Sequence, residues 1–289
     1  MEIWKYTWKD ITLVIAALLH FIGLNVWCFN YSELSLTINI SLILLFTMTM
    51  YYQPIIVVHN FVHNPFFISK LLNRIFAVIS SASMMMTVAG YKQHHFLHHQ
   101  YNNDRRKDEG TKHGPTLDPS STYRFGKDGE HEHFIPYSAF SLFRDATGYA
   151  IKRVLKKGEG PQLTIEVIAM VLTLALWAIT SWQWLLYMFV PTFFFGWFFA
   201  HMEGYFEHQM ATDPDSKFAN SVSYYGAFYN KYLMFNEGYH QAHHCRPGAH
   251  WTTRPEIDKK FKEEMTEAGA YISNYPPLLG FLDKKTNDQ

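Results

Sequence analysis

Four long apolar stretches constrain this chain of 289 residues more than any other feature. They carry almost no charged residues, and each approaches the ~20 apolar residues that a helix needs to cross a bilayer core of about 30 Å. Trp or Tyr flanks every stretch at one end or both, which is typical of membrane–water interfaces. Buried helices of a soluble protein are the alternative, and the lack of charge disfavours them. We expect membrane-spanning helices at about 11–29, 34–58, 163–182 and 184–200.

The distribution of Lys and Arg predicts the orientation of these spans. All 25 basic residues lie before the first stretch, between about 64 and 162, or after His208. The connections 30–33 and 181–183 contain none. Two hairpins with both chain termini on the cytoplasmic side satisfy the positive-inside rule. The formal net charge of zero gives no indication of a nucleic-acid partner.

Three histidine blocks with repeated spacing point to metal chemistry. One reads H-x-x-x-H and two read H-x-x-H-H, in a chain with 16 histidines. Imidazole suits iron, zinc and copper, and eight ligands are too many for one ion, so we expect a two-metal site. All three blocks fall on the predicted cytoplasmic side, although the hydropathy argument did not use them. The block histidines are His59 and His63; His95, His98 and His99; and His240, His243 and His244.

These observations predict an all-α integral membrane protein. Four transmembrane helices in two hairpins would carry a cytoplasmic helical cap with the histidine boxes, in one domain over residues 1–289. The cytoplasmic regions would be 59–162 and 201–289. We read 66–91 as an interfacial or re-entrant helix, because a fifth crossing would separate the histidine blocks. An amphipathic helix is expected at 134–157.

The order of the motifs resembles the integral-membrane fatty acid desaturase superfamily, which also contains hydroxylases, ketolases and oxidative decarboxylases. The resemblance covers about Val58 to Trp251. The segment Gly238-Tyr239-His240-Gln241-Ala242-His243-His244 is similar to the third box of sphingolipid and acyl-lipid desaturases, and so is Ser223-Tyr224-Tyr225-Gly226. The resemblance implies two irons on the cytoplasmic face, with O2 as co-substrate, that abstract hydrogen from an acyl methylene.

The resemblance also implies a ligand set, by position. It consists of His59, His63, His95, His98, His99, His208, His240, His243 and His244. His201 competes with His208, since a polar group deeper in a span is a functional candidate. Asn236 would complete the site through water, or else cap a helix. Nearby acids could orient imidazoles, or simply lie on solvated faces; they are Glu203, Glu207, Glu237, Asp104 and Asp108.

Electrons have to come from another protein. The chain contains neither a haem-binding His-Pro-Gly-Gly segment nor a glycine-rich dinucleotide fingerprint after a strand. The reaction class therefore implies a ferredoxin or cytochrome b5 type donor with its reductase. The patch Arg105-Arg106-Lys107 is a candidate dock, or a contact for anionic membrane lipids. The segment 118–124 is a candidate contact for the substrate head group through Arg124, with a surface loop as the alternative.

Several reactions fit these features. A fatty acid or acyl-lipid desaturase is the simplest. A hydroxylase, or an oxidative decarboxylase that forms a terminal alkene, would begin with the same hydrogen abstraction. A membrane zinc hydrolase of amide-linked lipids is more distant, because such enzymes use few histidines. A non-catalytic metal-binding or transport protein is disfavoured, because transporters hold their ligands near the bilayer midplane.

Overall fold

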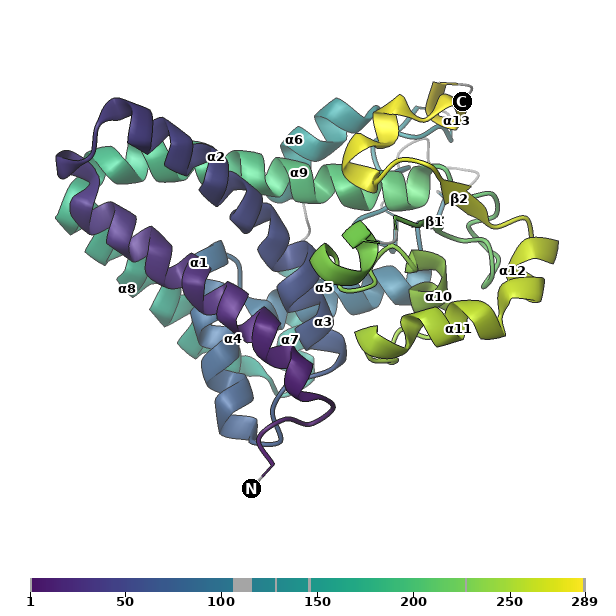
Figure 1. Cartoon of the computed structure of the whole chain (residues 1–289), viewed down its shortest axis with the longest axis horizontal. Helices are drawn as coiled ribbons and strands as arrows, with labels where there is room; N and C mark the ends of the chain where they lie inside the picture. The colour runs from purple at the N-terminus through teal and green to yellow at the C-terminus, as the bar shows by residue number, and fades with distance from the viewer. Residues whose placement is uncertain (1, 106–115, 128, 145–146, 227, 288–289) are drawn as a thin grey trace. The chain divides into compact units, whose positions relative to one another are not determined.

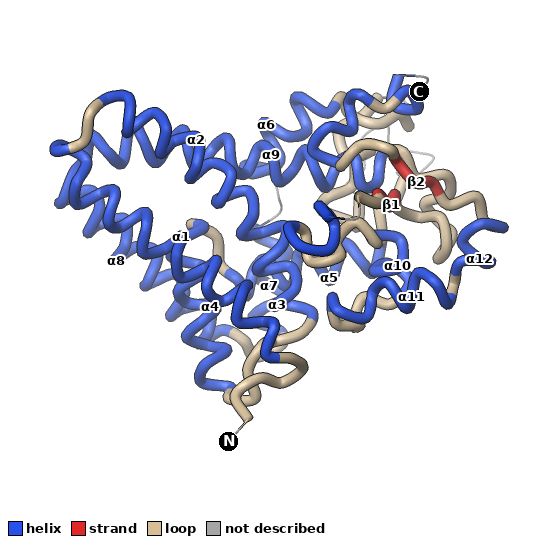
Figure 2. Tube along the Cα trace, in the orientation of Figure 1, coloured by secondary structure: helices blue, strands red, loops and turns tan. Residues whose placement is uncertain are grey.

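The computed structural model describes residues 2–105, 116–127, 129–144, 147–226 and 228–287. These residues are mostly helical, with two short strands (Figure 2). They divide into two units, here called unit 1 (1–93 and 147–200) and unit 2 (94–146 and 201–289). Two helices have residues in both units, α5 (Val88–Tyr101) and α9 (Val190–Gln209). That the whole chain acts as one membrane domain stays a prediction.

Unit 1 is built from long apolar helices. In Figure 1, α1 and α8 lie side by side. Their outward faces carry large apolar side chains, with Leu19 65% and Ile179 86% exposed. Such a surface suits hydrocarbon and not water. The α-helices that lie wholly in unit 1 are α1 (Ile11–Asn30), α2 (Leu36–Tyr52), α3 (His59–His63), α4 (Lys70–Met84), α7 (Thr147–Lys156) and α8 (Gly160–Trp184).

Three helical segments of the described residues are long and apolar enough to cross a membrane. They are Trp8–Glu33, Leu36–His63 and Gly160–Gln209. The pair α4 and α5, bent by 89°, would make a fourth if it formed one broken span. The chain is thus a mostly helical protein with three to four candidate membrane helices.

The segment Gly160–Gln209 contains both of the later predicted spans. Its helical geometry breaks at Ser181, which has φ −157° and ψ 93°. The Oγ of Ser181 accepts a hydrogen bond from the amide of Trp184 at 3.2 Å, as a helix N-cap does. The Trp177 ring lies 5.2 Å from the Trp184 ring and 4.7 Å from the Phe189 ring. The chain therefore folds back at the turn expected at 181–183.

Aromatic side chains form the core of unit 1. Trp27, Phe46, Trp177 and Trp184 are all buried there. The Trp27 indole donates to the side-chain oxygen of Asn39 at 2.7 Å, so this polar atom is satisfied away from water. Between apolar helices of this kind, close van der Waals contact of the large rings supplies the packing energy.

Short π- and 3₁₀-helical segments interrupt the α-helices. A π-helix inserts an extra residue per turn and so changes the face on which later side chains lie. One of them, Gln53–Val58 (η3), comes directly before α3 and its two histidines. The others are the π-helices Leu185–Phe189 (η4) and Tyr229–Leu233 (η5), and the 3₁₀-helices Trp8–Asp10 (η1), Tyr31–Glu33 (η2), Trp251–Thr253 (η6) and Pro277–Leu282 (η7).

Unit 2 combines short helices, loops and two strands. The strands β1 (Val222–Tyr224) and β2 (Tyr271–Ser273) pair in parallel, with Ser223 opposite Ile272. Where one amphipathic helix was expected at 134–157, the structure has α6 in unit 2 and α7 in unit 1. The α-helices wholly in unit 2 are α6 (Phe134–Arg144), α10 (His240–Cys245), α11 (Arg254–Lys260), α12 (Lys262–Glu267) and α13 (Lys284–Asn287).

Candidate metal centre

Helix α5 carries the second histidine block, and both of its ends are capped. At its start the amide of Gly90 donates to Oγ1 of Thr87 at 3.3 Å. Beyond its end, Asn103 adopts a positive φ of 55°, a conformation that asparagine tolerates after a helix. The Asn103 amide donates to the Asp118 carboxylate at 2.6 Å, and its side chain donates to the carbonyl of His208 at 3.4 Å. Asn103 therefore links the end of α5 to the Asp118 loop and to α9.

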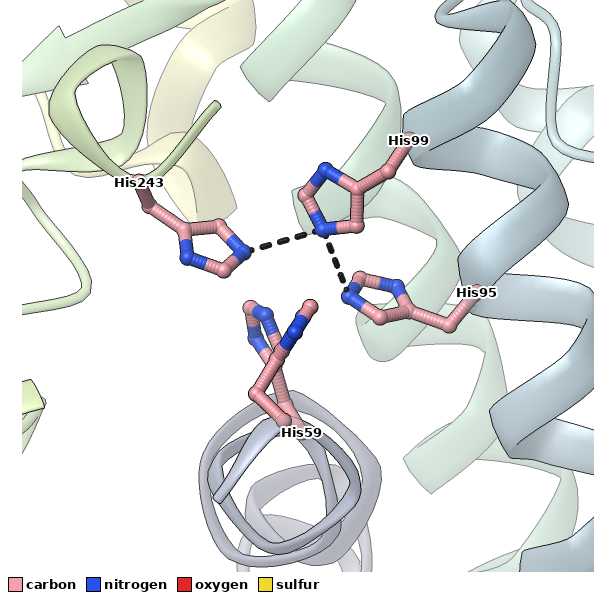
Figure 3. A group of neighbouring side chains, drawn as sticks. His59, His95, His99 and His243 are labelled. Carbon is pink, nitrogen blue, oxygen red and sulfur yellow. Dashed lines mark hydrogen bonds between the residues drawn. The ribbon is translucent and has the colours of Figure 1, made fainter. Parts of the chain in front are cut away.

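One group of imidazoles joins α5 to α10. The Nε2 atom of His99 lies 2.9 Å from Nε2 of His95 and 3.0 Å from Nε2 of His243. One ring nitrogen from each of the three lies within 4.8 Å of the others. Figure 3 shows the three rings pointing toward one another, two from α5 and one from α10. We call His95, His99 and His243 the first group.

A second group joins α5, α9 and α10. His98, His208 and His244 each offer a ring nitrogen within 4.8 Å of the other two, and all three side chains are buried. The Nε2 atom of His208 lies 3.0 Å from Nε2 of His98 and 3.2 Å from Nε2 of His240. The His240 ring centroid is 4.7 Å from that of His244. We call these four histidines the second group.

The H-x-x-H-H spacing divides each block between the two groups. On α5 the i, i+4 pair His95 and His99 enters the first group, and His98 enters the second. On α10 the assignment is reversed, since His243 enters the first group while His240 and His244 lie in the second. Residues four apart share a helix face and the residue between them points elsewhere. Two copies of one short motif thus serve two neighbouring sites.

The distances and the donor type fit transition-metal ions. Two nitrogen ligands held about 2.1 Å from one ion lie about 3.0–3.4 Å apart. The Nε2–Nε2 separations of 2.9–3.2 Å match this spacing. An all-imidazole donor set suits iron or zinc, whereas calcium and magnesium prefer oxygen ligands. Each group could therefore hold one such ion.

Hydrogen bonds at Nδ1 fix two rings of the second group. The Nδ1 atom of His98 lies 2.8 Å from Oδ2 of Asp118, and Nδ1 of His208 lies 3.3 Å from the carbonyl oxygen of Asn220. A carbonyl can only accept, so Nδ1 of His208 is the protonated nitrogen. A proton on Nδ1 leaves the Nε2 lone pair free to face the group.

Asp118 is fully buried beside His98, and its protonation state follows from its neighbours. Burial by itself would raise the pKa of this carboxyl. The electrostatic interaction and the hydrogen bond with His98, together with hydrogen bonds from the Asn103 amide and from Ser120, outweigh burial and hold the pKa of Asp118 below its usual range. Asp118 is therefore an ionised acceptor for His98 at neutral pH.

Three of the predicted acids are buried in unit 2: Glu203 and Glu207 on α9, and Glu237 before α10. Oε1 of Glu207 lies 3.3 Å from Nδ1 of His240. Glu237 forms an ion pair with Arg254, and both side chains are 1% exposed. The fully buried Glu203 accepts a hydrogen bond from the Tyr224 hydroxyl at 3.4 Å. None of the three lies on a solvated face.

The remaining predicted site residues are placed as follows. His59 and His63 lie four residues apart on α3 in unit 1, with ring centroids 5.2 Å apart. His201 belongs to neither histidine group among the described residues. Asn236 has a φ of 62°, and its side chain donates to the carbonyl of Trp251 at 3.1 Å. The residue directly before α10 is Tyr239, so Asn236 is not the cap of that helix.

The loop after α5 contains several of the predicted residues. Arg106, Lys107 and Asp108 lie outside the described residues. Asp104 accepts hydrogen bonds from the amides of Leu117 and Asp118, at 2.9 Å each, and so shapes the loop. Asp118, the first residue of the proposed head-group segment, lies within hydrogen-bond distance of His98, and the head-group contact itself stays a prediction. The Asp-Pro-Ser run predicts only a turn, because a contact across 20 residues leaves no local signal.

Comparison with protein families relates most of the chain to a known family. A family model described as fatty acid desaturase matches residues 34–276, which is more than half of the chain and includes every histidine of both groups. Searches of curated proteins and of solved structures each found no match.

Proposed function

The chain belongs to the fatty acid desaturase family, and we propose on this basis that it is an O2-dependent membrane oxidoreductase with two irons, which introduces a double bond into an acyl chain. The observation that carries the proposal is the pair of imidazole groups in unit 2. Seven ring systems from α5, α9 and α10 form two adjacent sites with metal-like nitrogen spacing.

The proposed ligand set extends beyond these seven. His59 and His63 belong to it because they repeat the i, i+4 spacing on a helix. Asn236 is proposed to act through water, and His201 remains an alternative to His208. The full proposed set is His59, His63, His95, His98, His99, His208, His240, His243 and His244.

In this proposal the protein side chains position the ligand nitrogens, and two bound irons would supply the redox chemistry. Two bound irons would provide the O2-dependent removal of hydrogen from an acyl carbon. Asp118 and Asn220 hold the Nδ1 sides of His98 and His208, which keeps both Nε2 atoms facing inward. Glu207 lies beside Nδ1 of His240 and can do the same. Burial of these rings keeps bulk water away from the ligand atoms.

The proposed arrangement in the cell follows from the spans and the charges. Four spans in two hairpins would place both chain termini and the metal site on the cytoplasmic side. The substrate would be a fatty acid or acyl-lipid, drawn from the surrounding membrane lipids. Two electrons for each turnover would come from an external ferredoxin or cytochrome b5 type donor with its reductase.

Product analysis tests the reaction type. The protein would be expressed in a host fed deuterium-labelled fatty acids, and its lipids would be analysed by mass spectrometry. A desaturase gives a product lighter by two hydrogens, or two deuteriums at the labelled carbons. An added oxygen would indicate hydroxylation, and a terminal alkene shorter by one carbon would indicate oxidative decarboxylation. Either of these would replace desaturation, and a protein carrying His98→Ala is the inactive control.

A zinc hydrolase of amide-linked lipids is the distant alternative. It would release a free fatty acid and an amine without consuming O2. Activity that persists under argon, with zinc in the purified protein, would therefore contradict the proposed oxidoreductase.

A further inference from the structure

Five exposed cations lie on or next to the two helices that contact α8 in unit 1. Two come from α4, Lys70 and Arg74, and three from α7 and the residue after it, Lys152, Lys156 and Lys157. Helix α4 packs against α8, and the α8 side chain of Gln162 donates to the Arg74 carbonyl at 3.4 Å. Helix α7 ends only four residues before α8 begins. We call these five residues the cationic belt.

The two acidic residues at the start of α8, Glu159 and Glu166, interact with residues outside the belt. Neither α4 nor α7 contains Asp or Glu. Glu159 pairs with Lys92 at 2.6 Å and also accepts from Gln93 at 3.2 Å. Glu166 is buried and accepts from the Ala89 amide at 2.9 Å. Within the described residues, no ion pair involves any member of the belt.

A defined turn holds α7 against the start of α8. Gly158 has a φ of 74°, the left-handed conformation that glycine adopts after a helix. The Gly158 amide donates to the Leu155 carbonyl at 3.0 Å, and the Glu159 amide donates to the Val154 carbonyl at 3.1 Å. These two bonds make a Schellman motif. The lysines of α7 are therefore held in place beside the span.

Exposed apolar side chains accompany the cations on both helices. On α4, Leu71 is 65% and Ile75 45% exposed, each next to a cation in sequence. On α7, Ile151 is 38% and Leu155 58% exposed, each directly before a lysine. Basic residues beside an exposed apolar face, repeated four residues apart, are typical of helices that lie in a membrane interface.

The depth of the belt fits the lipid head groups. The exposed apolar face of α8 starts at Ile165, which is 53% exposed. Five residues of α-helix separate it from Gly160, a rise of about 7.5 Å. The head-group region on each side of a bilayer is about 5–8 Å thick. The end of α7 would thus lie at head-group level when α8 crosses the hydrocarbon.

We propose that the cationic belt binds the phosphate groups of anionic membrane lipids. Clusters of four to eight basic residues beside a membrane helix attract such lipids, and each residue raises the affinity about fivefold. Three observations favour a lipid over a soluble anion. The belt cations form no ion pair among the described residues, exposed apolar side chains lie beside them, and the end of α7 would lie at head-group level. This site is separate from the histidine groups and does not depend on the proposed reaction.

Lipid binding to the purified protein tests the proposal. Wild type and the triple variant Lys152→Gln/Lys156→Gln/Lys157→Gln would be titrated in neutral detergent with phosphatidylglycerol and with phosphatidylcholine, and bound lipid measured by native mass spectrometry. The matched control is Lys259→Gln/Lys260→Gln/Lys262→Gln in unit 2, which removes the same charge. A Lys→Arg triple at the belt keeps the charge.

The expected result is a loss of phosphatidylglycerol affinity of roughly a hundredfold in the belt variant. The control and the Arg variant should bind like wild type, and high salt should weaken the wild-type complex. The proposal is overturned if the belt variant keeps wild-type affinity, if the control loses as much, or if wild type binds phosphatidylcholine equally well. Displacement by equimolar inorganic phosphate would identify a site for soluble anions, and would also overturn it.

Discussion

At the scale of single residues, the role of a histidine depends on its position within H-x-x-H-H. His98 and His99 are neighbours in sequence, but one belongs to the second group and the other to the first. Helical geometry explains this separation, because successive residues are rotated by about 100°. The sequence predicts the blocks as ligands together. It does not predict the division between two sites, which requires α5 and α10 to be placed next to each other.

Removing one histidine from each group should test this division. We expect His98→Ala and His243→Ala each to abolish product formation, while the protein still inserts into the membrane. Each variant should retain about one iron in place of two, because each loses a ligand of a different site. Metal analysis of the purified variants measures this. His133→Ala, an exposed histidine, is the control, and full activity in either ligand variant would remove that residue from the set.

Asp118 offers a second test at this scale. Replacing it by Asn removes the charge that holds Nδ1 of His98. We expect iron affinity to fall by about 10- to 100-fold, as is usual when the partner of a ligating histidine is lost. Competition with a chelator measures the change. The control is Asp283→Asn, which alters another buried carboxylate of unit 2 that accepts from Tyr271 and Ser273. Equal effects of the two variants would argue against a role at the metal.

At the scale of elements, α10 is held by a close approach of the backbone. A Cβ atom on Gly238 would lie 2.1 Å from the Tyr224 carbonyl oxygen and 2.7 Å from Nδ2 of Asn230. The Tyr224 amide donates to the Gly238 carbonyl at 2.8 Å, so β1 cannot easily move away. The third histidine block therefore starts two residues after a position that only glycine fits.

Gly238→Ala should consequently displace α10. We expect a loss of about 1–3 kcal/mol in the free energy of unfolding, the usual cost of forcing extra atoms into a packed site, and a lower iron content. Thermal unfolding and metal analysis would measure both. Gly248→Ala is the matched control, since nothing lies within 4 Å of its Cβ position. A Gly238→Ala protein as stable and as iron-rich as this control would contradict the role of the contact.

Local pattern predicted some elements well and others poorly. The apolar helices and the turn at 181–183 could be predicted from the sequence, because they depend on composition and on short-range signals. The π-helix η3 before His59 could not be predicted, because the extra residue in its turn is stabilised by residues that are distant in sequence. One such residue is Tyr91, whose hydroxyl donates to the Pro54 carbonyl at 2.8 Å. Asp118 was missed for the same reason, since its partner lies 20 residues away.

At the scale of the whole molecule, the chain combines an exposed apolar surface with a buried polar interior. Unit 1 exposes large apolar side chains such as Leu44, and unit 2 buries charged ones such as Glu203 and Arg254. Apolar exposure suits hydrocarbon, and buried charges need partners to avoid a large desolvation cost. The family match to residues 34–276 covers parts of both units. The matched family region therefore includes both candidate membrane helices and the two histidine groups.

The proposed topology can be checked by cysteine labelling. Both native cysteines, Cys28 and Cys245, are buried, so introduced ones dominate the signal. Ser32→Cys, between α1 and α2, should react with a membrane-impermeant maleimide in intact cells. Lys259→Cys in unit 2 should react only after the cells are permeabilised. Labelling of Lys259→Cys in intact cells would reverse the proposed orientation.

The most direct test of the central claim is the metal content of the purified protein, measured by mass spectrometry and by Mössbauer spectroscopy after growth on iron-57. The imidazole groups of α5, α9 and α10 predict two irons per chain with nitrogen ligands. A single zinc ion without iron, or a metal content that varies between preparations, would contradict a two-iron oxidoreductase.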